Sequence, residues 1–126
     1  MYGTDSADRL AGDEHFKGFA PGIDEMDLRG GNDVIRGYGG VDVIQGGFGD
    51  DLIDGGDGGD LLYGLHGDDT IYGGASSDSI YGDWIDGSSL ISGNDKLFGG
   101  DGIDSIRGGR GDDIIHGGEG SDSLRG

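Results

Sequence analysis

A nine-residue period organises almost the whole chain. From Phe19 to Tyr81, and again from Leu90 to Arg125, the sequence divides into eleven consecutive units of nine residues. The sixth residue of every unit is Asp, the eighth is Ile, Leu or Met, and the fourth is Gly except at Ser76. Such self-similarity is the signature of an architecture in which each unit stacks on its neighbours. The sequence therefore predicts a stacked solenoid.

Without this period, the composition would predict a disordered acidic chain. The 126 residues include 33 Gly, one Pro and no Cys, and the formal net charge is −18. The scarcity of Pro excludes collagen, and the absence of Cys excludes a disulfide scaffold. The negative charge repels nucleic acid and anionic lipid and calls for cations nearby. Whatever orders this chain must supplement its small apolar content.

Neither a membrane span nor an N-terminal secretion signal is expected. No apolar run approaches the roughly 20 residues that a membrane helix needs. The first residues, Met1 to Thr4, lack the basic and then apolar pattern of a cleaved signal peptide.

Each unit reads as a glycine-rich turn followed by a short strand. The last three residues, for example Leu52-Ile53-Asp54, place the eighth side chain on one face and its neighbours on the other. The preceding six residues suit a turn that needs positive φ and little side-chain bulk. Two units per coil would form two opposed sheets whose eighth residues meet in a core. Alternate units would then stack about 4.8 Å apart.

This spacing between coils explains why the sixth residue is always Asp. The acids are 23 Asp and only 3 Glu. Stacked carboxylates about 5 Å apart repel by roughly 3 kcal/mol at an effective dielectric near 20. A calcium ion, which takes six to eight oxygen ligands, fits between two coils and touches an Asp from each. Carbonyls of an extended turn point alternately up and down, so odd positions would serve one ion and even positions the next.

The unit GGFGDDLID, Gly46 to Asp54, matches the calcium-binding repeat GGxGxDxUx at every specified position. Over residues 19–125 the chain thus resembles the RTX, or haemolysin-type calcium-binding, repeat family. Gly3 to Ala11 keeps Asp8 and Leu10 and is similar to a decayed first repeat. The resemblance implies an all-β, right-handed parallel β-roll (β-solenoid) with two short strands per 18-residue coil. It also implies a secreted bacterial protein, exported by a type I system and folded by extracellular calcium.

The predicted calcium ligands are the sixth-position aspartates and the glycines of the turns. One flank is expected to carry Asp24, Asp42, Asp60, Asp78, Asp95 and Asp113, and the other Asp33, Asp51, Asp69, Asp104 and Asp122. The glycines are Gly40, Gly47, Gly49, Gly56, Gly58, Gly67, Gly100, Gly102, Gly109, Gly111, Gly118 and Gly120. About eight ions, one per pair of stacked units, would bring +16 against the formal net charge of −18.

The predicted organisation is one continuous domain. An irregular lead-in with the decayed repeat spans 1–18, repeats span 19–81 and 90–126, and residues 82–89 interrupt them. The segment Gly82 to Phe98 has 17 residues, one fewer than a coil, so we expect the interruption to replace a regular unit. Asp86 is then a candidate substitute ligand, and Trp84 is expected to pack against the roll.

The outward ninth positions carry two sets of side chains that suggest contacts. Tyr63, Tyr81 and Phe98 are expected to follow one another on one flank, with Tyr72 opposite. They either stack to support the sheet or bind a sugar or protein. On the opposite flank, a stripe of Arg36, Arg107 and Arg125 would suit an anionic polysaccharide.

No catalytic site is expected. His15, His66 and His116 share no zinc-ligand spacing, and neither HExxH nor GxSxG occurs. The favoured function is a non-catalytic calcium-binding module. The alternative is an accessory module of an extracellular enzyme, since similar repeats accompany proteases, lipases and mannuronan epimerases. Because a repeat directly precedes Gly126, we expect either a piece of a longer protein or ends closed by self-association.

Overall fold

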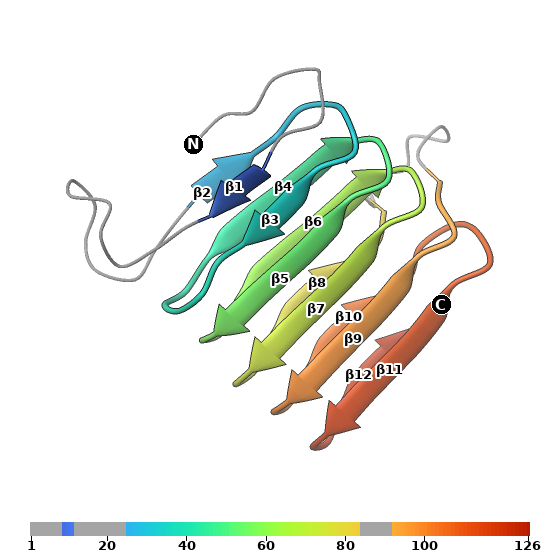
Figure 1. Ribbon diagram of the computed structural model, residues 1–126. Coiled ribbons are helices and arrows are strands. Elements are labelled where there is room, and N and C mark those ends of the chain that lie inside the picture. The colour runs from blue at the N-terminus through green and yellow to red at the C-terminus, as the bar shows by residue number, and fades with distance from the viewer. Residues whose placement is uncertain (1–8, 12–24, 84–91) are drawn as a thin grey trace.

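A computed structural model describes residues 9–11, 25–83 and 92–126, and within these ranges every regular element is a short β-strand (Figure 1). The strands are β1 (Arg9–Ala11), β2 (Glu25–Asp27), β3 (Val34–Arg36), β4 (Val43–Phe48), β5 (Leu52–Asp57), β6 (Leu61–His66), β7 (Thr70–Ala75), β8 (Ser79–Tyr81), β9 (Lys96–Asp101), β10 (Ser105–Arg107), β11 (Ile114–Glu119) and β12 (Ser123–Arg125). No helix in the described part of the chain is long and apolar enough to cross a membrane.

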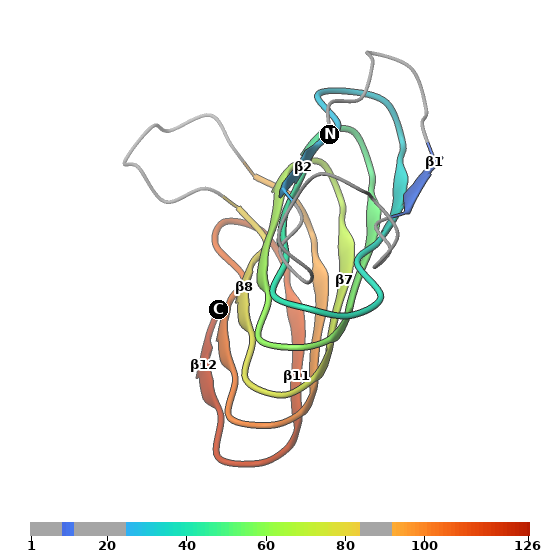
Figure 2. The same ribbon diagram turned by 90° about the vertical axis from the view of Figure 1, so that its left-hand side faces the viewer.

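The strands form two parallel sheets on opposite sides of a flattened coil, as Figure 2 shows. The odd-numbered strands follow the order β1-β3-β5-β7-β9-β11, and the even-numbered strands follow β12-β10-β8-β6-β4-β2. Each strand therefore pairs with the strand two units away, as the period predicts. This topology is a β-solenoid of about 5 turns with coils of about 18 residues, and it fits the expected right-handed β-roll.

The core is one file of aliphatic side chains between the sheets. Its members are wholly buried: Leu28, Ile35, Ile44, Ile53, Leu62, Ile71, Ile80, Leu97 and Ile106. All except Leu28 are eighth-position residues, which confirms the assignment of that position to the interior. Because the core is a single file of side chains, the remaining stability has to come from contacts between coils along the axis.

The turns depend on positive φ at the second and fourth positions of the uninterrupted units. Glycine occupies most of these positions, and four other residues adopt the same conformation: Arg29, Tyr38, Leu65 and Ser76, with φ between 68° and 90°. Close packing adds a second requirement, since a Cβ at Gly58 would collide with the main-chain oxygen of Gly40 in the preceding coil. At Gly58, where φ is 134°, glycine is thus needed for both conformation and space.

The interruption does not replace a unit, and the prediction that it does is wrong. The Gly82 N–H donates to the Arg107 carbonyl at 2.9 Å, as the first-position Gly37 donates to Asp54 at 2.8 Å. Gly82 and Asp83 therefore remain in the coil as its first two residues. Residues 84–91, which lie outside the described ranges, are the added segment, and Ser92 resumes at the third position. Trp84 and Asp86 fall in that segment.

This connection changes the flanks after the interruption. The structure places Asp95 and Asp113 with Asp33, Asp51 and Asp69, whereas Asp104 and Asp122 lie with Asp42, Asp60 and Asp78. The prediction that Asp95 follows Asp78, and that Asp104 follows Asp69, was wrong. The added segment leaves and rejoins the same turn, so the units keep alternating between the two flanks.

Candidate metal centres

The sixth-position aspartates form two buried rows, one along each edge of the roll. The members of these rows that are no more than 3% exposed are Asp33, Asp42, Asp51, Asp60, Asp69, Asp78, Asp95 and Asp104. Asp113 and Asp122, in the last coil, are half-buried. Asp24 lies outside the described residues. Full burial of a carboxylate requires hydrogen bonds or a counter-charge, so each row must contain compensating groups.

From Asp51 to Asp122, one oxygen of each sixth-position carboxylate is compensated by the main chain. In every pair, Oδ1 accepts the N–H of the aspartate one coil earlier, at 2.8 to 3.0 Å. The donor and acceptor pairs are Asp33–Asp51, Asp42–Asp60, Asp51–Asp69, Asp60–Asp78, Asp69–Asp95, Asp78–Asp104, Asp95–Asp113 and Asp104–Asp122. These bonds fix the register of successive coils.

The other oxygen has no hydrogen-bond partner although it is buried. This holds for Oδ2 of Asp51, Asp60, Asp69, Asp78, Asp95 and Asp104. Each of these oxygens lies against the first-position glycine of its own unit. Next to Gly46, for example, Asp51 Oδ2 and the Gly64 carbonyl oxygen of the following coil approach the same point, where a side chain would otherwise stand. Two electronegative oxygens facing one another across a buried gap form half of a hard-cation site.

The raised pKa values of these carboxyls reflect the same lack of a partner for the buried oxygen. Burial, as the largest cause, raises the pKa of Asp69 to about 8, and repulsion from Asp51 and Asp95 adds to it. Burial likewise raises the pKa of Asp78 and of Asp95 to about 7 and that of Asp51 to about 6. Hydrogen bonds from the main chain oppose the shift at each residue without cancelling it. The rows therefore need either protons or cations at neutral pH.

Main-chain oxygens also point into the gaps between coils. The fourth-position carbonyl of Gly40 points to the following coil at Gly58, whereas the first-position carbonyl of Gly64 points back to Gly46. The predicted alternation of even and odd carbonyls is thus confirmed. Among the predicted glycines, the carbonyl has this forward orientation at Gly40, Gly49, Gly56, Gly67, Gly100 and Gly102. Gly47, Gly58, Gly109, Gly111, Gly118 and Gly120 lie at the same second or fourth turn positions with positive φ.

The first-position glycines were not predicted as part of the site. Gly37, Gly46, Gly55, Gly73, Gly82 and Gly99 each leave space for an Oδ2 atom of their own flank and a carbonyl of the following coil. The signal was present in the sequence, because Gly opens most units. Turn formation alone would explain this pattern, whereas the structure shows that these glycines make room for the carboxylate.

A second ladder, also missed, is continuous along one edge of the described coils, whereas on the opposite edge a bond of this kind joins the Ile103 N–H to Ser77 Oγ at 3.2 Å. Its members are the fifth-position residues Asn32, Asp50, Asp68, Asn94 and Asp112. Each side-chain Oδ1 accepts the N–H of the next member, at 2.8 to 3.1 Å. These bonds run toward later coils, whereas the sixth-position carboxylates bond toward earlier coils. The two ladders therefore join neighbouring coils from both sides.

Asp83 is a further buried acid that the sequence analysis did not identify. It is 3% exposed, its Oδ2 accepts the Arg110 N–H at 2.6 Å, and its Oδ1 has no hydrogen-bond partner. Burial, as the largest cause, raises its pKa, and Asp113 repels it. Asp83 therefore adds charge to an edge that already carries a carboxylate row.

The described side chains alone do not form a metal cage. Within the described ranges, no three or more His, Cys, Asp or Glu side chains gather in a way that could hold a metal ion. The donor set that is present consists of one or two carboxylates with several carbonyls. Calcium accepts such a mixed shell of oxygens, whereas zinc sites favour nitrogen and sulfur.

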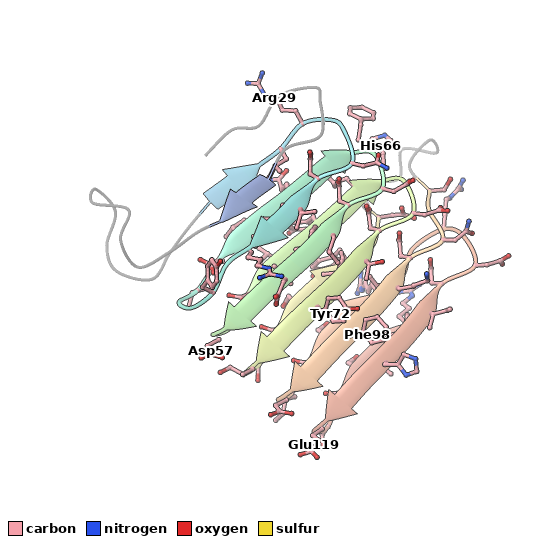
Figure 3. The ribbon with its side chains drawn as sticks, viewed as in Figure 1. Arg29, Asp57, His66, Tyr72, Phe98 and Glu119 are labelled. Atoms are coloured by element: carbon pink, nitrogen blue, oxygen red, sulfur yellow. The ribbon has the colours of Figure 1, made fainter. Side chains whose placement is uncertain are left out.

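The outer aromatic side chains stack in pairs on each sheet. Tyr63 and Tyr81 are 5.1 Å apart between ring centroids, with rings inclined by 15°. On the opposite sheet, Tyr72 and Phe98 (Figure 3) are 4.9 Å apart, with rings inclined by 11°. His116 continues the second stack at 5.3 Å from Phe98. The stacking predicted as one alternative is confirmed, but the placement of Phe98 after Tyr81 was wrong. This error has the same cause as the wrong flank assignment of the aspartates after the interruption.

The predicted arginine stripe is also not formed. Arg107 pairs with Tyr81 and Arg125 on the even-numbered sheet, whereas Arg36 pairs with Asp54 on the odd-numbered sheet. Of the histidines, His66 is half-buried and stacks on Phe48 at 4.2 Å, His116 is exposed, and His15 lies outside the described residues.

Comparison with known proteins identifies the repeat. A family model described as the RTX calcium-binding nonapeptide repeat (4 copies) matches residues 27–62, 54–84 and 91–124. The searches of curated proteins and of solved structures found no match. The family match covers more than half of the chain and coincides with the two buried carboxylate rows. The chain belongs to the RTX calcium-binding nonapeptide repeat family.

Proposed function

We propose that this β-roll is a calcium-dependent folding module of a secreted protein, in which ions held between coils convert an unfolded acidic chain into the stacked structure. The observation that carries this proposal is the repeated, buried Oδ2 atom with no hydrogen-bond partner. Such an atom stabilises a folded chain only when it is protonated or bound to a cation. At neutral pH the cation is the stronger of the two options.

The residues present fit calcium. The sixth-position aspartates would hold it, with the first-position and even-position carbonyls completing the shell. Bound calcium supplies positive charge between stacked carboxylates. About eight ions, one for each hydrogen-bonded aspartate pair, would bring +16 to a chain with a formal net charge of −18.

The same arrangement supports a role in export. Because the ligands come from coils that exist only in the folded chain, calcium-binding free energy becomes folding free energy. A chain with this property stays unfolded where calcium is scarce and folds where it is abundant. Membership of the RTX family supports secretion by a type I system, and we assign no catalytic activity to the chain itself.

The test is a calcium titration of the chelator-treated protein, followed by circular dichroism and calorimetry. We expect a change from coil to β-structure and uptake of about eight ions, one for each aspartate pair. Magnesium at equal concentration should be much less effective, because it demands a small octahedral shell. Identical spectra in chelator and in calcium would refute the proposal. Sedimentation of the same samples tests the predicted end-to-end self-association.

An accessory role beside an extracellular enzyme is the second candidate, favoured by the exposed ring of Tyr72 next to Phe98. The rings face each other within the stack, so a sugar would meet their edges rather than their faces. A polysaccharide contact is tested on a glycan array by comparing the wild type with a Tyr72→Ala, Phe98→Ala double variant, and with a Tyr63→Ala, Tyr81→Ala double variant of the opposite sheet. Uronate binding that is lost on changing Arg107 and Arg125 to Ser would favour the same candidate.

A further inference from the structure

Asp83 stands where no regular unit of the roll carries an acid. It occupies the second position of the coil from which residues 84–91 branch, a position held in the uninterrupted units by Gly, Ala20, Arg29, Tyr38 or Leu65. Its carboxyl group is buried, although the residue lies beside the exit of an added segment. A buried acid that neither the repeat pattern nor the turn conformation requires needs another explanation.

One carboxylate oxygen of Asp83 substitutes for a main-chain carbonyl. In regular coils the third-position N–H donates to the second-position carbonyl of the preceding coil, as Phe48 does to Arg29 at 2.8 Å. The equivalent donor, Arg110 N–H, bonds instead to Asp83 Oδ2 at 2.6 Å. Similarly, a Cβ placed on Gly109 would meet Asp83 Oδ2 at 2.6 Å, whereas at Gly47 it would meet the Arg29 carbonyl. A charged oxygen therefore replaces a dipolar one.

The second oxygen, Asp83 Oδ1, is buried and has no hydrogen-bond partner. The same inter-coil gap also contains the regular pair of oxygens, since Asp95 Oδ2 and the Gly108 carbonyl both approach Gly82. The N–H of Asp83 donates to that Gly108 carbonyl at 3.1 Å, which places Asp83 directly beside the pair. The branch point thus holds the carboxylate and the first-position carbonyl of a regular gap, and the Asp83 carboxylate is added in place of the second-position carbonyl.

The charges around Asp83 favour a cation there. Repulsion from Asp113 acts on Asp83 more strongly than the attraction of His66 or of the Arg110 side chain. Asp83 is in turn the carboxylate that repels Asp95 most strongly. A divalent ion between these groups would relieve both repulsions, whereas in a regular gap it relieves one pair.

We propose that the gap between the coil of Gly82 and Asp95 and the coil of Gly108 and Asp113 is the highest-affinity cation site of this roll, with Asp83 as its additional acidic ligand. The inference rests on the proposed calcium-dependent function. Main-chain oxygens complete the shell, as they do in the regular gaps. The site fills first on calcium addition and anchors the two regular halves that flank residues 84–91.

The test combines calcium calorimetry of the full chain with terbium luminescence. Asp83→Asn keeps an acceptor for Arg110 N–H but removes the charge, and Asp83→Gly restores the regular residue. Asp57→Asn is the matched control, because Asp57 is an exposed acid of the same size. We expect both Asp83 variants to weaken the tightest calcium step by at least about tenfold, and the control to change it by less than about twofold.

Terbium gives a readout that does not depend on how well a variant folds. Trp84, the only Trp, directly follows Asp83 in the sequence, so selective indole excitation should sensitise an ion bound there. In the wild type, the first terbium equivalents should give this emission. Emission that appears only with the last equivalents would overturn the inference, as would an unchanged tightest step in Asp83→Asn. Absence of any calcium binding by the wild type would instead refute the proposed function.

Discussion

The main-chain N–H of Asp69 donates a 2.9 Å hydrogen bond to Asp95 Oδ1 across 26 residues of sequence. The preceding bond of the same row, from Asp51 to Asp69, is 2.8 Å long and spans 18 residues. The geometry of the row is therefore unchanged where eight residues have been added. Coil stacking follows the turn positions, and separation along the chain does not alter it.

Deletion of residues 84–91 should consequently leave the roll intact. Joining Asp83 directly to Ser92 restores a unit of nine residues and preserves the Asp69–Asp95 contact. We expect the same calcium-dependent circular dichroism spectrum, and a free energy of unfolding that is unchanged or higher because a loop has been shortened. Deleting nine residues, 84–92, is the control, since it should shift the phase and weaken calcium-dependent folding. Loss of folding in the eight-residue deletion would contradict the assignment of Gly82 and Asp83 to the coil.

Alanine at Gly73 should weaken folding far more than alanine at Gly39. A Cβ on Gly73 would collide with Asp78 Oδ2 and approach the Gly99 carbonyl to 2.6 Å. At Gly39 the nearest atom is the Asp57 carbonyl oxygen at 3.7 Å, an ordinary contact, and φ is not in the left-handed region. We expect a loss of about 1 to 3 kcal/mol for Gly73→Ala, with reduced calcium affinity. Gly39→Ala should be neutral or slightly stabilising.

Calcium titrations monitored by circular dichroism give both quantities for the pair. Equal effects of Gly73→Ala and Gly39→Ala would show that the first-position glycine serves only the turn conformation, and that the space beside the carboxylate has no role.

Without calcium, acid should favour the roll. The pKa values of Asp51, Asp78, Asp95 and Asp69 are raised from 3.8 to about 6, 7, 7 and 8. A folded-state pKa above the unfolded value favours folding fully below pH 3.8, and this stabilisation is lost as the pH rises through about 6 to 8. In chelator, we therefore expect β-structure to increase on acidification toward pH 4. Excess calcium should reverse the trend, since protons and calcium compete for the same oxygens.

The measurement is circular dichroism from pH 4 to pH 8, in chelator and in calcium. A chelator-treated chain that lost β-structure on acidification would contradict the burial of uncompensated carboxyls. An Asp69→Asn variant should depend less on pH in chelator, because it lacks the carboxyl with the most strongly raised pKa.

The ring stack on the odd-numbered sheet should couple Tyr72 to Phe98. In a double-mutant cycle with Ala, we expect a coupling free energy of about 0.5 to 1.5 kcal/mol in saturating calcium. Phe98 and Tyr81 lie on opposite sheets, so their cycle should be close to additive and serves as the control. Coupling between Phe98 and Tyr81, but not between Phe98 and Tyr72, would support the order Tyr63, Tyr81, Phe98 that the sequence predicted.

The fold and the carboxylate rows could be predicted because each nine-residue unit encodes them locally. Core residues such as Ile53 and Ile71 follow from the eighth position, and Asp51 and Asp69 follow from the sixth. The order of units after the interruption could not be derived by counting residues, since a count does not show which residues leave the coil. A signal did exist: Leu90 and Ile91 stand where most units begin with Gly.

Asp83 was missed for a related reason. The period assigns it to the interruption, whereas its own hydrogen bonds and those of Gly82 to the following coil place it inside the coil. The fifth-position ladder from Asn32 to Asp112 was missed because its Asp and Asn side chains recur only in every second unit. Comparison of all units together obscures a pattern that alternates.

The branch at Asp83 has a consequence for how such proteins diversify. The chain leaves and re-enters one turn without disturbing the hydrogen bonds between adjacent coils. This position can therefore accept an inserted segment whose sequence and length do not affect the β-roll. Longer loops or entire domains could be accommodated there by the same route. The number of coils and the segments inserted at such turns can then evolve separately.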